Sequence, residues 1–188
     1  MDFFNTLNRT VVLKIKNRTG VEMIYNEETI NAIKDFLVER EESIAVAESV
    51  TAGHLQAALS AAVEASKCFQ GGITTYNIGQ KTRHLHIDPI LGRKVNCVAV
   101  KIAHRMAVEA ASLFSSEYGV GITGYASIVP ECEKEGLFAY FSIAYKGDIV
   151  LTEKITSAEK NPYNVQVNYT LQVLDKLLAY LQNNKTSY

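Results

Sequence analysis

The sequence is poor in cysteine and proline, with three of each among its 188 residues. Cys68, Cys97 and Cys132 are odd in number and widely spaced, and no CxxC pair or Cys/His cluster has the spacing of a zinc site. This pattern excludes a disulfide-rich scaffold and predicts free, buried thiols in a reducing compartment. Internal repeats and low-complexity tracts are also lacking, which leaves an ordinary globular protein.

An excess of charge of either sign is lacking too. The 19 basic and 20 acidic residues leave a formal charge of -1, and the pI is near 6.4. Such a balance produces no overall field that would recruit nucleic acid or an anionic membrane. Aromatic and basic residues do not interleave as they do along single-stranded nucleic-acid grooves. We therefore expect no nucleic-acid partner.

Long apolar runs are absent as well. The best one, LFAYFSIAY at residues 137–145, is far shorter than the ~20 residues that a membrane-spanning helix needs. The opening MDFFNTLNRT does not have the basic-then-apolar order of a signal peptide. We therefore expect a cytoplasmic protein without a membrane partner.

The residues that are present predict one domain of the α/β class. Periodicity predicts helices over 27–40, 51–64, 78–85, 98–116 and 163–182, and strands over 43–49, 71–77, 119–124 and the hairpin 137–145/148–156. Helices between the early strands and a hairpin late in the chain indicate a mixed sheet in an α/β sandwich. Residues 1–26 are interpreted as an N-terminal extension, in which TVVLKIKN (10–17) alternates enough to form an edge strand.

Three predicted strands end in turns rich in hydroxyl and amide groups. The first turn is Glu48-Ser49-Val50-Thr51, the second is Tyr76-Asn77 followed by Lys81, and the third is Thr123-Gly124. Ligands of open α/β sheets bind outside the carboxyl ends of the strands, so these turns predict a shared site. A serine hydroxyl becomes a nucleophile when a base takes its proton, and a desolvated lysine can serve as that base.

Each turn also has a purely structural interpretation. Ser49 and Thr51 are good N-cap residues for the helix that follows them, and Lys81 in a first helical turn is commonly solvated. His84 and His86, with Asp88 nearby, could begin a metal site, but the sequence places no third ligand, and the end of a surface helix is favoured. The residues alone do not select amide hydrolysis.

Three longer stretches carry a resemblance to a known family. AESVTAGHLQAALS, FQGGITTYNIGQKTRHLHID and GVGITG occur in the order and spacing of the CinA C-terminal-domain family, over about residues 27–182. The resemblance implies a three-layer α/β/α sandwich with a mixed sheet in a single domain, 27–188. It also implies a nicotinamide-nucleotide amidohydrolase, which converts nicotinamide mononucleotide (NMN) to nicotinate mononucleotide and ammonia.

The resemblance assigns roles to individual residues. Ser49 matches the nucleophile, Lys81 the base, and Tyr76 the tyrosine of the same catalytic motif. The expected substrate-binding residues are Glu48, Thr51, Gly53, Gly71, Gly72, Asn77, Thr123 and Gly124. We expect a small nucleotide-like substrate, no metal and no cofactor, and the apolar helices leave room for a homodimer.

Several positions depart from the family pattern. Ala52 stands where the family has a glycine, and YASIVPECEKEG (125–136) replaces a glycine- and proline-rich loop. Asn96-Cys97-Val98-Ala99 replaces Gly-Ala-Val-Ser, and the arginines expected before the last helix are absent from EKNPYNVQVNYT. Two hypotheses follow: a deamidase with a remodelled pocket, or a degenerate relative that binds a nucleotide-like ligand or a protein partner without turnover.

Overall fold

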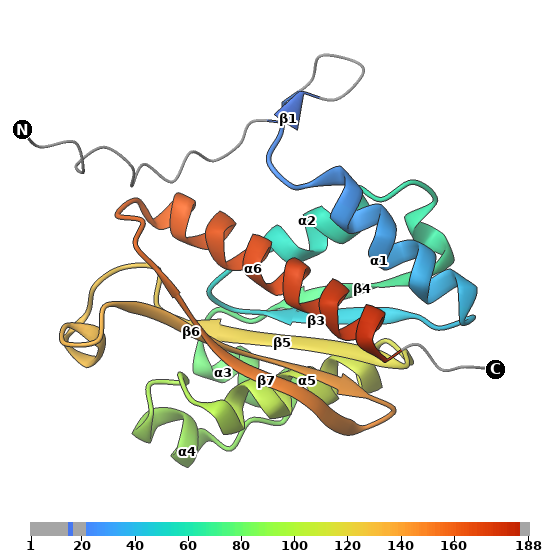
Figure 1. Ribbon diagram of the computed structural model, residues 1–188. Helices are drawn as coiled ribbons and strands as arrows, with labels where there is room; N and C mark the ends of the chain where they lie inside the picture. The colour runs from blue at the N-terminus through green and yellow to red at the C-terminus, as the bar shows by residue number, and fades with distance from the viewer. Residues whose placement is uncertain (1–14, 17–21, 185–188) are drawn as a thin grey trace, which may run out of the picture.

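The computed structural model describes residues 15–16 and 22–184, and five of its strands form one mixed sheet (Figure 1). The strand order is β4-β3-β5-β6-β7, with bounds β3 Ile44–Glu48, β4 Phe69–Thr74, β5 Tyr118–Gly124, β6 Leu137–Tyr145 and β7 Asp148–Ser157. β3 pairs in parallel with β4 and β5, whereas β6 and β7 are antiparallel. The predicted mixed sheet and the late hairpin are confirmed.

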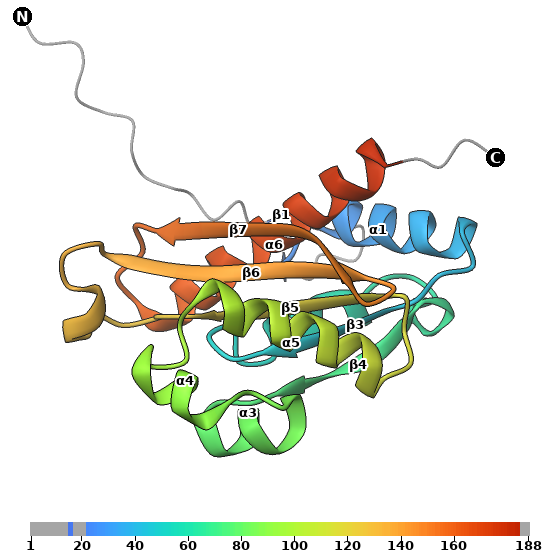
Figure 2. The same ribbon diagram turned by 90° about the horizontal axis from the view of Figure 1, so that it is seen from below.

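Helices cover both faces of the sheet. One face carries α1 (Glu27–Glu39), α2 (His54–Ser60) and α6 (Pro162–Asn183), and the other carries α3 (Ile78–Leu85), α4 (Pro89–Lys94) and α5 (Val100–Leu113). Figure 2, turned by 90°, shows α5, α3 and α4 in front of the sheet and α1 and α6 behind it. The three-layer α/β/α sandwich is confirmed.

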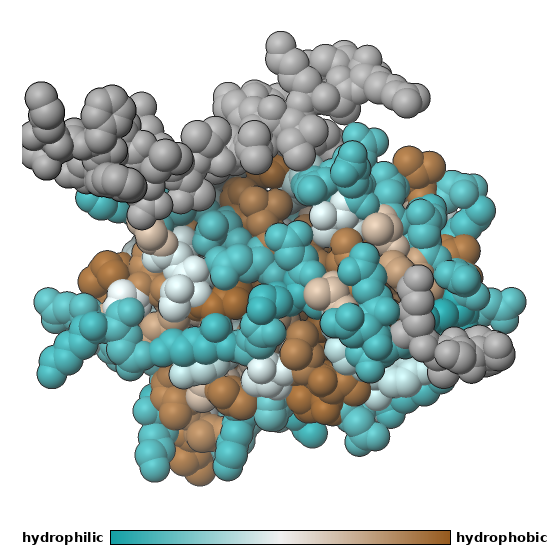
Figure 3. Space-filling model, viewed as in Figure 1, coloured by the Kyte–Doolittle hydropathy of each residue, from teal (hydrophilic) through white to brown (hydrophobic). Residues whose placement is uncertain are grey.

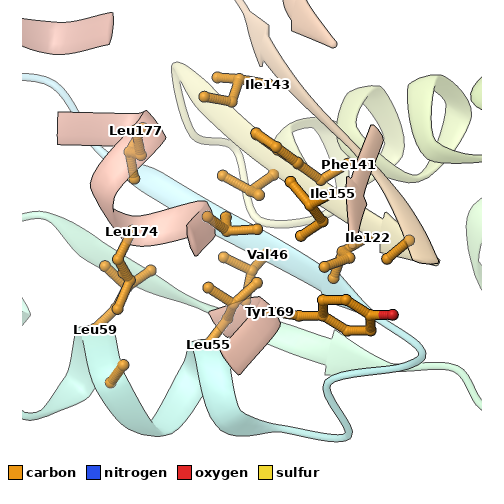
Figure 4. Close-up of a cluster of buried hydrophobic side chains, with 14 of the residues drawn as sticks. Val46, Leu55, Leu59, Ile122, Phe141, Ile143, Ile155, Tyr169, Leu174 and Leu177 are labelled. Carbon is orange, nitrogen blue, oxygen red and sulfur yellow. The ribbon is translucent and has the colours of Figure 1, made fainter. Parts of the chain in front are cut away.

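The main core lies between the sheet and the α1, α2 and α6 layer. Its apolar side chains come from the strands and from all three helices on that side. Figure 4 labels ten of them: Val46, Leu55, Leu59, Ile122, Phe141, Ile143, Ile155, Tyr169, Leu174 and Leu177. All five residues of β3 are buried, as expected for a strand that is covered on both faces. This burial fixes β3, so the turn after Glu48 lies at a defined place at the carboxyl end of the strand.

Some predicted boundaries are wrong. The helix predicted over 51–64 extends only over His54–Ser60, because Ala52 and Gly53 have φ angles of 52° and 106°, outside the helical range. Val63, within the range predicted as an amphipathic helix, lies beyond α2 and is 60 % exposed, and Leu113 at the end of α5 is 52 % exposed. The helix α4 was not predicted; Asp88 caps it by accepting a hydrogen bond from the Ile90 N–H at 2.8 Å.

The N-terminal extension lies largely outside the described residues. Its described part forms β1 (Ile15–Lys16) and β2 (Glu22–Met23), which pair antiparallel in a separate two-stranded sheet. This part of the predicted edge strand does not join the edge of the five-stranded sheet; residues 10–14 and 17 lie outside the described residues. None of the helices described is long and apolar enough to cross a membrane.

Candidate active site

A pocket of about 540 Å³ lies where β3, β4 and β5 end. This volume is within the range that small-molecule sites commonly occupy. Six of the residues predicted for the site line it: Ser49, Tyr76, Asn77, Lys81, Thr123 and Gly124. The prediction that these three turns meet at the carboxyl ends of the strands is confirmed.

Ser49 follows β3 directly and is held by the neighbouring strand. Its N–H donates to the Ile122 carbonyl of β5 at 3.1 Å, and the side chain is 8 % exposed. The hydroxyl lies 2.8 Å from the Lys81 ammonium nitrogen Nζ. A serine oxygen and a lysine nitrogen at this distance form a hydrogen-bonded pair at the floor of the pocket.

Lys81 is buried rather than solvated, with 1 % of its surface exposed. Asn77 caps α3 by accepting from the Gln80 N–H at 3.1 Å, and this helix start sets Lys81 one turn into α3. Besides Ser49, Nζ contacts the carbonyl oxygens of Thr75 at 2.6 Å and Tyr76 at 3.5 Å. Burial lowers the pKa of Lys81 to about 8, because removal from water penalises the charged amine.

Tyr76 and Asn77 form one rim of the pocket. The Tyr76 side chain is 75 % exposed, so its ring stands at the mouth and only its carbonyl reaches Lys81. Asn77 is exposed as well, and its side-chain oxygen is engaged as the helix cap. Neither side chain contacts the Ser49 hydroxyl.

Thr123 and Gly124 form the opposite wall at the end of β5. The Thr123 hydroxyl donates to the Cys97 carbonyl at 2.7 Å, which ties β5 to the turn before α5. A Cβ on Gly124 would lie 2.5 Å from Ala139 of β6, so glycine here permits the close approach of the two strands. Both residues line the pocket while serving the packing around it.

Glu48 does not face the pocket. Its fully buried carboxylate accepts four hydrogen bonds at the start of α2: from the N–H groups of Gly53 (3.1 Å), Leu55 (3.0 Å) and Gln56 (2.9 Å), and from the Gln56 side-chain amide (3.1 Å). These are N–H groups that a helix start leaves without an internal partner, and a negative charge there also complements the helix dipole. Glu48 thus holds α2 against β3.

The predicted capping of α2 by Ser49 or Thr51 is therefore wrong. The N-cap is Gly53, in a left-handed conformation and without a side-chain capping bond. Thr51 is fully buried, does not line the pocket, and its hydroxyl has no hydrogen-bond partner among the described residues. Ala52 adopts a positive φ, is exposed and does not line the pocket.

Gly71 and Gly72 lie in β4 and also stay outside the pocket. Gly71 has φ of 132°, and a Cβ there would lie 3.0 Å from the ring of Phe114. A Cβ on Gly72 would meet side-chain atoms of Gln56 and Val46 at 2.6 Å. Both glycines serve the packing of β4 against its neighbours.

The structure adds pocket residues that the sequence analysis did not single out as ligands. Arg93, Asn96 and Cys97 enter from the end of α4 and the turn after it, and Gln166 enters from α6. Asn96 and Cys97 both have positive φ, and the Cys97 N–H donates to the Gly92 carbonyl at 2.7 Å. Residues in this left-handed conformation commonly follow the end of a helix. Asn96, a few residues after Pro89, was therefore the signal in the sequence that could have indicated α4 and the turn after it.

The histidines near α3 are engaged individually. His84 pairs with Gln80 at 3.1 Å, and His86 pairs with Glu109 at 2.7 Å. Among the residues described, no group of three or more His, Cys, Asp or Glu side chains is arranged to hold a metal ion. The described part of the site thus offers a buried, hydrogen-bonded serine–lysine pair and no metal cluster.

Comparisons with known proteins agree with this architecture. Residues 26–181 match the model of the CinA C-terminal domain. A CinA-like protein of Dictyoglomus thermophilum is 28 % identical over 179 residues, covering 92 % of this chain and 42 % of that protein. A CinA-like protein of a Picosynechococcus species is 37 % identical over 94 residues, covering 50 % and 22 %. The chain thus matches less than half the length of these relatives.

Solved structures share the fold. A competence-damaged protein (CinA) superfamily protein from Escherichia coli superposes with a TM-score of 0.73 at 25 % identity, covering 82 % of this chain and 89 % of that one. A competence damage-inducible protein A from Klebsiella pneumoniae gives a TM-score of 0.77 at 21 % identity, covering 86 % and 99 %. The family model spans most of the chain, and the strand ends that it matches are those that build the pocket. The chain therefore belongs to the CinA C-terminal domain family.

Proposed function

We propose that this protein is an amidohydrolase that deamidates nicotinamide mononucleotide, with Ser49 as the nucleophile and Lys81 as the general base. The observation that carries the proposal is the 2.8 Å contact between Ser49 Oγ and a buried Lys81 Nζ in a pocket at the strand ends. A lysine whose pKa is lowered to about 8 is partly neutral near pH 7, so it has a lone pair available for a proton.

The carbonyl contacts orient that lone pair. A neutral amine has two N–H donors and one lone pair. The Thr75 and Tyr76 carbonyls at 2.6 and 3.5 Å accept the two hydrogens, and the lone pair then faces the Ser49 hydroxyl, which donates to it. This arrangement keeps the base in the geometry that proton removal from serine requires.

Backbone donors at the same turn suit the oxyanion of an amide addition. Within the described residues, the N–H of Ser49 bonds to β5 and those of Ala52, Gly53 and His54 bond within the turn and to Glu48, whereas the N–H of Val50 takes no part in these bonds. Val50 lines the pocket beside the nucleophile. Preorganised N–H groups of this kind stabilise the charge that develops in acyl transfer.

The steps balance with these groups alone. Ser49 Oγ attacks the carboxamide carbon while Lys81 takes the hydroxyl proton. The tetrahedral intermediate collapses, the C–N bond breaks, and Lys81 returns the proton to the leaving nitrogen, which departs as ammonia. A water molecule, deprotonated by Lys81, then attacks the acyl-serine ester, and the C–O bond to Ser49 breaks while Lys81 returns the proton to Ser49 Oγ. The acid product gives its proton to ammonia or water and leaves as the carboxylate, which restores Ser49 and neutral Lys81.

Ammonia release and nicotinate mononucleotide formation from NMN test the proposal directly. Ser49→Ala and Lys81→Met should each reduce kcat by at least about 10³-fold, because each removes a member of one chemical unit. Ser60→Ala and Lys101→Met are matched controls on exposed positions outside the pocket, and both should retain wild-type rates.

The competing hypothesis of a binding protein without turnover predicts a different pattern. Folded wild-type protein would release no ammonia, yet saturating NMN would raise its Tm, because a ligand that binds only the native state stabilises it. That result would contradict hydrolysis of NMN and support the degenerate relative.

A further inference from the structure

The charges that line the pocket are all of one sign. Its 16 lining residues include two basic side chains, Lys81 and Arg93, and no aspartate or glutamate. Lys81 is occupied by Ser49 and two carbonyls, whereas Arg93 is exposed and has no hydrogen bond or ion pair among the described residues. We infer that Arg93 binds the phosphate of the nucleotide substrate, an assignment that rests on the proposed function and names its anion-recognising residue.

The backbone that carries Arg93 is well anchored. Gly92 lies so close to α3 that a Cβ on it would meet Ile78 at 2.8 Å. The turn after α4 is closed by the bond from the Cys97 N–H to the Gly92 carbonyl at 2.7 Å and by a bond from the Val98 N–H to the Val95 carbonyl at 2.8 Å. The backbone of Arg93 is therefore held in a defined position at the pocket.

Phosphate suits this placement, and it is the anion that a mononucleotide carries. A guanidinium offers parallel N–H donors that match two phosphate oxygens, and a charged, bidentate pair is among the strongest polar contacts that an exposed rim can make. Arg93 lies on α4, whereas Ser49 follows the end of β3. One ligand that fills the pocket would therefore place its amide at Ser49 and its phosphate at Arg93.

The rest of the pocket lacks another cation for this task. α6 contributes Gln166, an uncharged amide, from the segment in which the family resemblance predicts arginines. Asn96 is held at the rim by donating its side-chain amide to Glu131 at 3.2 Å. A phosphate that enters this pocket consequently finds its only free positive charge, among the described residues, at Arg93.

Lys94 separates ligand binding from a structural effect. Arg93 and Lys94 are consecutive, both exposed, and both in the last turn of α4, where a positive charge also complements the helix dipole. Only Arg93 lines the pocket. Any effect through helix stability or net charge would therefore appear in both alanine variants.

The test is calorimetric titration of the Ser49→Ala protein, which holds substrate without turnover, with NMN and with nicotinamide riboside, which lacks the phosphate. Adding Arg93→Ala should weaken NMN binding about 10- to 100-fold, the range that losing a charge-assisted hydrogen-bonded pair produces. Riboside affinity should be unchanged, Lys94→Ala should leave both ligands unaffected, and Arg93→Lys should lie between the alanine variant and the parent.

Three results would overturn the inference: NMN affinity that Arg93→Ala leaves unchanged, riboside affinity that falls by the same factor, or no binding of NMN at all. Circular dichroism of each variant verifies that it is folded. These outcomes are independent of turnover, because ammonia release by the wild-type protein decides the proposed function separately. If the wild-type protein releases ammonia from NMN but Arg93→Ala leaves NMN affinity unchanged, the proposed function stands and the assignment of Arg93 to the phosphate is wrong.

Discussion

The fold changes the chemistry of Lys81 at the floor of the pocket. In water its amine would be protonated at neutral pH, but at 1 % exposure its pKa falls to about 8 because the charged form loses its hydration. The contact with Ser49 then joins this amine to a buried serine hydroxyl, the pair that the proposed mechanism uses as base and nucleophile. This pairing depends on a side-chain conformation that no local sequence pattern specifies.

The pH dependence of the reaction follows from that shift. In the proposed mechanism Lys81 acts in its neutral form, so kcat/KM for NMN hydrolysis should rise with pH, follow an apparent pKa of about 8, and level off above it. Below that pKa the rate should fall about tenfold per pH unit. Ammonia release measured across this range provides the profile, and a rate that does not change across pH 8 would contradict Lys81 as the base.

Glu48 should contribute strongly to stability. Glu48→Gln replaces one carboxylate oxygen by an amide donor that faces backbone N–H groups, so buried hydrogen bonds are lost and the free energy of unfolding should drop by about 2–3 kcal/mol. Urea unfolding measures the difference. Glu28→Gln, on the exposed first turn of α1, should change the value by less than about 0.5 kcal/mol.

Equal losses in the two variants would show that the four hydrogen bonds of Glu48 do not carry the stability of α2. The contrast between them isolates burial, because both substitutions remove one carboxylate near a helix start. The family resemblance implied that Glu48 binds substrate; its partners in the structure are the backbone and side chain at the beginning of α2.

At the scale of secondary-structure elements, α5 packs unusually close to β5. A Cβ on Gly119 would lie 2.0 Å from the Ala107 carbonyl, and one on Gly121 would lie 2.4 Å from the Ala107 N–H and 2.5 Å from the Ala103 carbonyl. These are contacts with helix backbone, which cannot rotate away as a side chain can. The small residues of GVGITG therefore set the distance between the sheet and its second helical layer.

Gly121→Ala should consequently separate α5 from the sheet. We expect a loss of about 3 kcal/mol in the free energy of unfolding, at the upper end of overpacking effects, because the clash falls on backbone atoms. Gly79→Ala in the exposed face of α3 is the control, and it should change stability by no more than about 1 kcal/mol. A Gly121→Ala protein as stable as the control would refute the close-packing account.

Element positions were predicted better than element ends. The last helix was found from periodicity, because burial of one face imposes a repeat on the sequence. The strand 43–49 was found from its short apolar run, which is typical of a strand buried on both faces, and the hairpin from the turn at Lys146-Gly147. The start of α2 was misplaced, since Glu48 supplies the capping interaction from several residues upstream and Ala52 takes a left-handed conformation. The short helix α4 was missed because six residues hold too little periodicity to detect.

At the scale of the whole molecule, the pocket is assembled from both helical layers. α3 and α4 lie on one side of the sheet and α6 on the other, yet all three contribute lining residues at the strand ends. Hydrophobic residues gather on the surface where α4 lies (Figure 3), and Ile90 of α4 is 80 % exposed. The site thus depends on the relative placement of layers as much as on any single element.

Tyr169 links the two sides. This fully buried residue of α6 donates from its hydroxyl to the Tyr125 carbonyl at 3.1 Å, and Tyr125 lines the pocket at the end of β5. Tyr169→Phe removes that bond without changing ring packing, so the free energy of unfolding should fall by about 1 kcal/mol. KM for NMN should rise, because the loop that follows β5 loses its hydrogen bond to α6. Urea unfolding and steady-state kinetics check both effects.

Tyr163→Phe supplies the control for that experiment. Tyr163 begins the same helix, is 49 % exposed and does not line the pocket, so its variant should match wild type in stability and KM. If Tyr169→Phe also leaves both values unchanged, α6 does not hold the loop that follows β5.

The sequence by itself determined the α/β class, the mixed sheet, the family, and the turns that would meet at the site. These properties follow from periodicity and from short motifs, which are local in the chain. Only the tertiary structure decided that Lys81 is buried against Ser49, that Glu48 holds α2, and that Arg93 lines the pocket. The physical reason is that burial and hydrogen bonding depend on residues that are distant in sequence, 32 positions apart for Ser49 and Lys81, and brought together only when the layers pack.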